Sequence, residues 1–276
     1  LTLGAAEPAN YYSSCEGKTG EALLKALAGV VSNHKNVGYD GLWEVYKTSD
    51  VHPDGTLWDI YTTKNWGKTF TKCGNYKVIG DCINRELSFP KSWWGGNKAA
   101  QYSDAYHLYP TDGKVNGQRS NYPYGECAGG KSLANNGNVR ALGRLGTSTF
   151  SGFSGTVFEP DDEYKGDLAR SYFYMATAYN SSIAQWTQGN GSQMLAGNSY
   201  PVFKEWSLNL LLKWSRQDPV SDKEVNRNEA ISRHQNNRNP FIDHPELVEY
   251  IWGNKKGVAW YIGADNDPSI YAPADG

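Results

Sequence analysis

The sequence predicts a single α+β domain, and three observations support this fold class. Helical patterns occupy both ends of the 276-residue chain, and β-like and loop-rich segments lie between them. No internal repeat or low-complexity linker divides the sequence. We expect residues 1–262 to form the domain. Residues 263–276 are expected to form a frayed tail, since they contain Asp265, Asp267, Pro268 and Pro273.

The composition excludes several broad classes of protein. The chain carries 27 basic and 29 acidic residues, so a positive coat over the whole surface is excluded, although a local basic groove is not. No stretch approaches the roughly 20 apolar residues that a membrane-spanning helix needs. Aromatic residues make up 13% of the chain, and disordered chains are poor in them, so we expect a folded protein.

The first helix is predicted directly after Thr19, which can cap it, and is expected to end between residues 33 and 38. The apolar residues of its buried face are Leu23, Leu27, Val30 and Val31. Residues 42–46 and 58–62 are β-like, because they contain aromatic and β-branched side chains. Residues 64–125 are rich in Gly, Asn and Pro, which predicts a segment dominated by loops, and such long loops are usually functional.

The C-terminal half is predicted to be helical. Four helices are expected, over residues 167–179, 203–214, 221–234 and 243–252. Ser221 and Glu224 form a capping-box pattern at the start of the third helix. Asp243, which precedes His244 and Pro245, is predicted to cap the fourth.

The four cysteines allow three disulfide pairings. They are Cys15, Cys73, Cys82 and Cys127. Cys73 and Cys82 flank a short segment with a turn signal at each end, so we expect them to pair and to leave Cys15 for Cys127. A zinc site and four free thiols are the alternatives. The even count favours an oxidising compartment. Because the chain begins at Leu1 rather than Met, we expect a signal peptide to have been removed.

The segment 84–125 contains the residues best suited to chemistry. Glu86 and Asn116, 30 residues apart, could supply the carboxylate and amide oxygens that a hard cation such as Mg²⁺ prefers. Residues 113–145 carry five basic residues against one acidic residue, a net charge of +4 in a chain of net charge −2. This charge favours an anionic substrate, although a charged loop can equally be a solvated surface.

Three long phrases in this segment resemble one family of proteins. They are residues 84–93 (Asn-Arg-Glu-Leu-Ser-Phe-Pro-Lys-Ser-Trp), 103–113 (Ser-Asp-Ala-Tyr-His-Leu-Tyr-Pro-Thr-Asp-Gly) and 115–123 (Val-Asn-Gly-Gln-Arg-Ser-Asn-Tyr-Pro). They are similar to the endonuclease I family of secreted and periplasmic bacterial nucleases, which have a His-Me finger (ββα-metal) active site. Further similar phrases extend the likeness to roughly residues 10–255; they lie at residues 11–12, 57–61, 158–160, 165–170, 218–221 and 237–245.

The resemblance implies a metal-dependent phosphodiesterase with a His-Me finger core surrounded by helices and long loops. Glu86 and Asn116 would hold one Mg²⁺, or another divalent cation such as Ca²⁺ or Mn²⁺. Arg119 would contact phosphate, and His107 would lie beside the site and orient ligands or backbone. The family hydrolyses DNA, and often RNA, without strong sequence preference and leaves 5′ phosphates. We therefore expect a secreted or periplasmic monomer that binds the phosphate backbone of nucleic acids.

One residue departs from the family pattern. The family places a His directly after the metal-binding Glu, where it acts as general base, and this chain has Leu87. Leucine cannot take a proton, and the loss of a general base typically costs about 10²–10⁴-fold in rate. Leu87 therefore indicates a natural nucleic-acid-binding pseudoenzyme, a substituted inactive form, or an enzyme with another base. The candidates for another base are His107 and Glu86, the latter acting through a metal-bound water.

A third class of function is a secreted carbohydrate-binding protein. The clustered aromatic residues Trp93 and Trp94 could stack on sugars. Aromatic residues are more often part of a core, so this hypothesis ranks behind the nuclease and the inactive nucleic-acid-binding protein.

Overall fold

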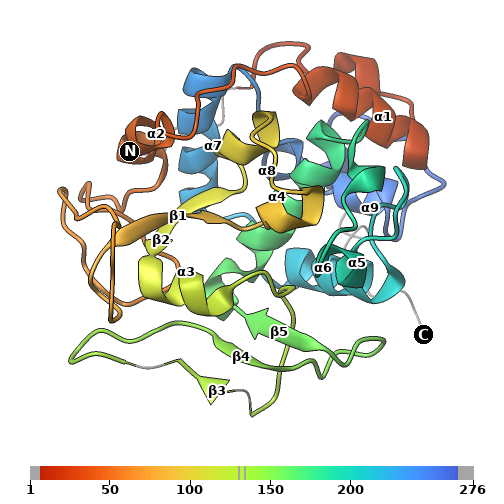
Figure 1. Cartoon of the computed structure of the whole chain (residues 1–276). Helices are drawn as coiled ribbons and strands as arrows, with labels where there is room; N and C mark the ends of the chain where they lie inside the picture. Colours follow the sequence, from red (N-terminus) through yellow and green to blue (C-terminus); the bar gives the residue numbers. More distant parts are fainter. Residues whose placement is uncertain (1–6, 130, 134, 267–276) are drawn as a thin grey trace.

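Two antiparallel strands followed directly by a short helix form the part of the fold that carries the candidate site (Figure 1). In the computed structural model, which describes residues 7–129, 131–133 and 135–266, strand β1 (Ile83–Leu87) pairs with β2 (Leu108–Asp112). Helix α3 (Gly113–Arg119) begins at the end of β2 because the Asp112 carboxylate accepts hydrogen bonds from the backbone N–H groups of Lys114 and Val115. This ββα unit places Glu86 on a strand and Asn116 on the helix that packs against it.

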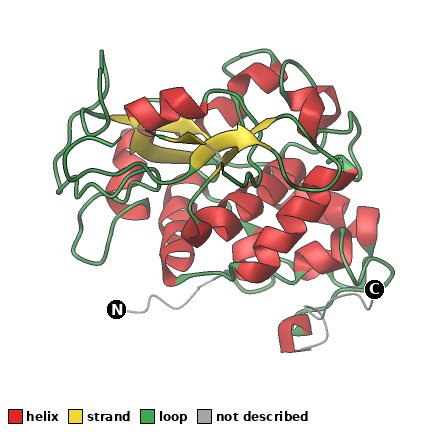
Figure 2. Ribbon diagram, turned by 90° about the horizontal axis from the view of Figure 1, so that it is seen from below, coloured by secondary structure: helices red, strands yellow, loops and turns green. Residues whose placement is uncertain are grey.

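The remaining helices and a second sheet surround this unit (Figure 1). Every residue of helix α4 (Lys165–Ala178) is buried, and it packs against several other helices. The other α-helices are α1 (Gly20–Val31), α2 (Leu42–Ser49), α5 (Gly191–Met194), α6 (Glu205–Gln217), α7 (Asp222–Gln235), α8 (Pro240–Asp243) and α9 (Leu247–Ile251). The second sheet is antiparallel, in the order β3 (Lys131–Ser132), β4 (Arg144–Thr147), β5 (Thr156–Glu159). Figure 2 shows the strands close together, with a large group of helices along one side of them.

A single hydrophobic core joins both ends of the described chain. It runs from Tyr12 to Trp260 and includes residues of α1, α4, α6 and α9. The predicted α+β class in one domain is therefore confirmed. Of the predicted tail, residues 264–266 form a short 3₁₀ helix, and residues 267–276 lie outside the described part. None of the described helices is long and apolar enough to span a membrane.

Several predicted elements are confirmed. The N-terminal helix is α1, and it ends slightly before the predicted range. Helix α7 begins with the predicted capping box, in which Ser221 Oγ accepts from the Glu224 N–H and the Glu224 carboxylate accepts from the Ser221 N–H. The helices expected at 167–179 and 203–214 are α4 and α6, with ends that differ from the prediction by one to three residues.

Two predicted elements are wrong, and a third is confirmed only in part. Residues 42–46 belong to helix α2, in which Leu42, Val45, Tyr46 and Ser49 are buried at helical spacing, and the five-residue window was too short to show that period. Residues 58–62 form no strand. The Asp59 carboxylate accepts from the Tyr61 N–H, from Thr62 Oγ1 and from Trp66 Nε1, which turns the backbone. The helix expected at 243–252 is confirmed only for residues 247–251, which form α9. Its predicted cap, Asp243, is instead the last residue of the short helix α8, which Asn239 caps and which ends before His244.

The cysteine prediction is half confirmed. Cys73 and Cys82 form a disulfide across the turn that precedes β1. The pairing of Cys15 with Cys127 is wrong, since both are buried free thiols. Cys15 lies in the 3₁₀ helix Ser13–Cys15, whereas the Cys127 N–H donates to the Glu159 carboxylate beside β5. An even number of cysteines does not require that every cysteine pairs.

Candidate active site

Glu86 is the buried carboxylate at the centre of the ββα unit. It is 3% exposed, and burial raises its pKa, while Arg119 and Tyr61 act in the opposite direction. Its Oε2 accepts from the Tyr61 hydroxyl at 2.7 Å and lies 3.4 Å from Nη1 of Arg119. Its Oε1 accepts no hydrogen bond from any described residue, yet it is not among the unpartnered oxygens that are shielded from solvent. This oxygen is therefore open to a ligand.

Asn116 presents a second oxygen donor from α3. The residue is partly buried, and its side chain makes no hydrogen bond to another residue in the part of the chain that the structure describes. One carboxylate oxygen and one amide oxygen on packed elements suit a hard divalent cation whose other ligands are water and phosphate. No group of three or more His, Cys, Asp or Glu side chains lies close enough to bind a metal among the described residues. A metal held in this part of the chain would thus need ligands besides these four residue types, such as amide oxygens, water or phosphate.

Arg119 lies behind Glu86 and is completely buried. Each of its side-chain nitrogens donates within the protein: to the backbone oxygens of Leu87, Ser88 and Tyr122 and to the hydroxyls of Tyr124 and Tyr172, at 2.8 to 3.4 Å. A phosphate could reach this guanidinium only if some of these bonds broke. The geometry therefore supports a role in positioning Glu86 and the end of β1, rather than the predicted phosphate contact.

A chain of hydrogen bonds links Arg119 to Glu86 through two tyrosines. Arg119 Nη1 donates to the Tyr124 hydroxyl at 3.1 Å, and the two hydroxyls of Tyr124 and Tyr61 lie 2.6 Å apart. Tyr61 donates its one hydroxyl proton to Glu86, so Tyr124 must be the donor to Tyr61. Each hydrogen bond is thus donated in the direction from Arg119 to Glu86. Burial raises the pKa of both tyrosines, which keeps them neutral donors.

The sequence reasoning missed Tyr61, Tyr124 and Tyr172. Tyr61 ends a family-like phrase, and Tyr124 directly follows another, so both tyrosines lie in or beside segments that the resemblance singles out. The sequence does not show that the tyrosines meet around Glu86 and Arg119, because these contacts join residues 25 to 63 positions apart.

Leu87 occupies the position after Glu86 without offering a proton acceptor. Its backbone pairs with Leu108, and its partly buried side chain packs against the hydrophobic core. The Leu87 carbonyl accepts from Arg119, so the end of β1 is held in place although the side chain is inert. The backbone of β1 is therefore held in place at Leu87, although the side chain offers no proton acceptor.

His107 precedes β2 and is completely buried. Its Nε2 lies 2.7 Å from the Gln101 carbonyl, and its Nδ1 accepts from the Phe89 N–H at 3.4 Å. Burial is the main cause that lowers its pKa to about 4, so the ring is neutral near pH 7 and Nε2 donates to Gln101. These contacts favour the expected role in orienting backbone, since both nitrogens are engaged, and they do not favour a role as general base.

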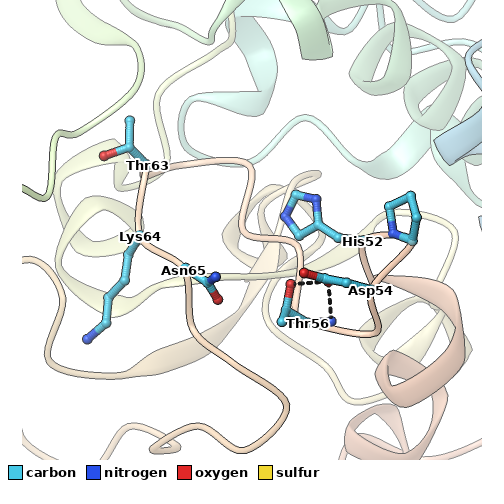
Figure 3. A pocket seen from close by; sticks show the side chains of 7 residues that line it. His52, Asp54, Thr56, Thr63, Lys64 and Asn65 are labelled. Atoms are coloured by element: carbon cyan, nitrogen blue, oxygen red, sulfur yellow. Dashed lines mark hydrogen bonds between the residues drawn. The ribbon is translucent and has the colours of Figure 1, made fainter.

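Two other candidate binding features, a surface hollow and a pair of tryptophans, do not form the site. A hollow of about 510 Å³ lies between residues 52–56 and 63–65 (Figure 3), and two of its charged groups are already paired: Asp54 accepts from Thr56, and Lys64 donates to the Gly80 carbonyl. Trp93 and Trp94 are buried in the core, so the sugar-stacking hypothesis loses its proposed residues.

Comparison with known proteins decides the family. A family model described as endonuclease I matches residues 19–246, which include the whole ββα unit. The chain belongs to the endonuclease I family. Extracellular ribonucleases of Bacillus amyloliquefaciens and Bacillus subtilis (strain 168) are each 35% identical to it, over 90% of this chain and 80% of their own length. A periplasmic deoxyribonuclease of Aeromonas hydrophila is 27% identical over 53% of this chain and 51% of its own.

The buried role of Arg119 can be tested by replacing it with lysine. For Arg119→Lys we expect the free energy of unfolding in urea to fall by about 3 kcal/mol, because a lysine cannot serve all the buried acceptors that the guanidinium fork serves. Arg233→Lys, at a side chain that is 62% exposed, should change stability by less than about 0.5 kcal/mol. Unchanged stability together with weaker nucleic-acid binding in Arg119→Lys would instead identify Arg119 as a phosphate ligand.

The depressed pKa of His107 predicts a pH dependence of stability. In the unfolded chain the His107 ring is protonated below about pH 6.5, whereas in the folded chain burial lowers its pKa to about 4. The free energy of unfolding should therefore fall as the pH is lowered from 6.5 to 4. Urea unfolding across this range should show a shallower pH dependence in His107→Asn than in the native protein. His234→Asn is the control and should keep the native slope. A native slope in His107→Asn would show that His107 is not the titrating group.

Proposed function

We propose that this member of the endonuclease I family binds nucleic acid at Glu86 and Asn116 together with Mg²⁺, or with Ca²⁺ or Mn²⁺, and that its cleavage activity is impaired. The single observation that carries the proposal is the difference between the two carboxylate oxygens of Glu86. Its Oε2 is held by Tyr61 and Arg119, while its Oε1 is unpartnered within the described chain and open to a ligand. The donor set of carboxylate and amide oxygens fits a hard divalent cation.

The residues of this chain would contribute mainly by preorganisation. When bound, the cation would polarise the scissile phosphate and stabilise the leaving 3′ oxygen, which yields 5′-phosphate products. The Arg119–Tyr124–Tyr61 chain holds Glu86 in one orientation, so little rearrangement is needed when substrate arrives. Arg119 and His107 also hold the backbone directly after Leu87, through the Ser88 carbonyl and the Phe89 N–H respectively.

The missing group is an acceptor for the proton of the attacking water. Leu87 has none, and His107 is buried with both ring nitrogens engaged. The same observation favours the second candidate function, a catalytically inactive nucleic-acid-binding protein of the same fold. The two candidates share the site at Glu86 and Asn116, and they differ in whether any residual cleavage occurs.

The relatives guide the choice of substrate and compartment. Those that cover most of the chain are named extracellular ribonucleases, and shorter matches are named extracellular or periplasmic deoxyribonucleases. We propose RNA and DNA as ligands of this chain, bound through the phosphate backbone by a secreted or periplasmic monomer. We assign residues up to 262 to the nuclease domain, because the core extends to Trp260.

The proposal is tested by restoring a base at the position after Glu86. Leu87→His should cleave supercoiled plasmid and structured RNA in Mg²⁺ about 10²–10⁴-fold faster than the native chain, because the scaffold around the position is already held in place. EDTA should abolish the gain. The double variant Leu87→His, Glu86→Gln should return to background, which ties the restored activity to the same carboxylate.

Each other result has a definite meaning. Cleavage by the native chain at the rate of the Leu87→His variant would show that another residue is the base. If both proteins are silent but bind nucleic acid, the inactive binding function is favoured. Silence together with no binding would contradict the proposed function as a whole.

A further inference from the structure

A stack of three aromatic rings and one guanidinium lies beside β1. The rings of Tyr102 and Tyr39 stack with centroids 4.4 Å apart. The Arg85 guanidinium lies 3.6 Å from the Tyr39 centroid and 4.7 Å from that of Trp43. We call Tyr102, Tyr39, Arg85 and Trp43 the Arg85 stack. Its members come from four segments: the loop before α2, helix α2, strand β1 and the 3₁₀ helix Ala100–Ser103 that precedes β2 (Figure 1).

The Arg85 stack is partly exposed and carries positive charge at both ends. The ammonium groups of Lys91 and Lys98 each lie 5.9 Å from the Tyr102 centroid, and that of Lys72 lies 5.0 Å from the Trp43 centroid. All three lysines are exposed, and each stack member is intermediate in burial. Asp40, which accepts from Arg85 at 3.1 Å, is the acidic residue that the stack engages. The surface is therefore aromatic and net positive.

Tyr102 is the last ring of the stack, and it also packs in part against the hydrophobic core. Tyr39 covers one face of the Tyr102 ring, and no second aromatic ring stacks on Tyr102 among the residues that the structure describes. The two lysines beside it have no ion-pair partner in the same part of the chain. A planar ligand that stacks on Tyr102 would thus continue the column, and anionic groups of the same ligand would meet Lys91 and Lys98.

The Arg85 stack and the candidate active site share strand β1. Arg85 directly precedes Glu86, and its side chain shares a face of β1 with Leu87, about 7 Å along the strand. Lys91 follows Leu87 by four residues, in the short 3₁₀ helix Lys91–Trp94. Glu86 points to the opposite face of the strand, so a polymer bound at Glu86 would have to pass the Leu87 end of β1 to reach the stack.

We propose that the Arg85 stack is a subsite for an unpaired nucleobase, with Lys91 and Lys98 holding the flanking phosphates; this inference rests on the proposed function. Bases stack on aromatic side chains and lysines track the backbone in proteins that bind single strands, and such stacking tolerates any base. In a duplex the base faces are covered by neighbouring pairs. The stack therefore gives this chain a preference for single-stranded segments of RNA or DNA over duplex.

The experiment measures binding without cleavage. A fluorescein-labelled single-stranded oligonucleotide is titrated with protein in EDTA, and anisotropy gives the affinity. Tyr102→Ala should bind it about 5- to 150-fold more weakly, the range for loss of one stacked base. Tyr102→Phe should keep the native affinity because it keeps the ring. Tyr261→Ala, at an exposed aromatic residue outside the stack, is the matched control and should bind like the native protein.

A second measurement needs no variant. The native protein should bind an abasic oligonucleotide of the same length, and a duplex of the same sequence, more weakly than the normal single strand. Equal affinity of the native protein for abasic and normal strands, or native affinity in Tyr102→Ala, would overturn the subsite. Failure of the Leu87→His cleavage assay would contradict the proposed function without changing these binding results, so the two failures are distinguishable.

Discussion

The candidate site depends on one buried guanidinium. Arg119 is fully enclosed, and a charge in that position is tolerated only when it is paired and fully hydrogen-bonded. Its partners include Glu86 on β1, Tyr124 beyond α3 and Tyr172 on the buried helix α4. The requirement to satisfy this one side chain therefore draws the strand, its following loop and the central helix into a fixed arrangement. Glu86 is oriented as a consequence.

Burial of the Glu86 and Arg119 charges is energetically unfavourable if the two residues serve only the fold. Burial raises the pKa of Glu86, and buried ion pairs can often be replaced by apolar residues without loss of stability. A scaffold that keeps a carboxylate buried on one side and open on the other is better explained by a ligand at the open oxygen. Leu87 sits within the same scaffold, so the binding part of the site and the proton-accepting part are physically separable in this chain.

The sequence predicted the parts of the site that depend on local pattern. The Cys73–Cys82 disulfide could be predicted because a turn signal lies at each end of the segment between the two cysteines. The capping box of α7 could likewise be predicted from a local pattern. The resemblance to a ββα-metal family, rather than the loop-rich composition of residues 64–125, implied the strand that carries Glu86 and the helix that carries Asn116. The family resemblance then supplied the candidate roles, and the match over residues 19–246 confirmed the family.

The rest depends on contacts between distant segments. No local pattern shows that the hydroxyls of Tyr61 and Tyr124 lie in contact. Nor does any local pattern show that the Arg119 side chain is buried and donates hydrogen bonds to backbone carbonyls. The pattern of residues 42–46 wrongly predicts a strand, because five residues cannot distinguish an amphipathic helix from a β segment rich in aromatic residues. Cys15 and Cys127 are free because their surroundings in the fold, rather than their number, decide whether they pair.

Titration with Mn²⁺ in the absence of nucleic acid tests the central claim most directly. Calorimetry or electron paramagnetic resonance would count the bound ions. We predict one saturable site in the native chain that is lost in Glu86→Gln and kept in Glu21→Gln, a control at a side chain that is 51% exposed. Native Mn²⁺ binding in Glu86→Gln would contradict the claim that the open oxygen of this buried carboxylate is a metal ligand.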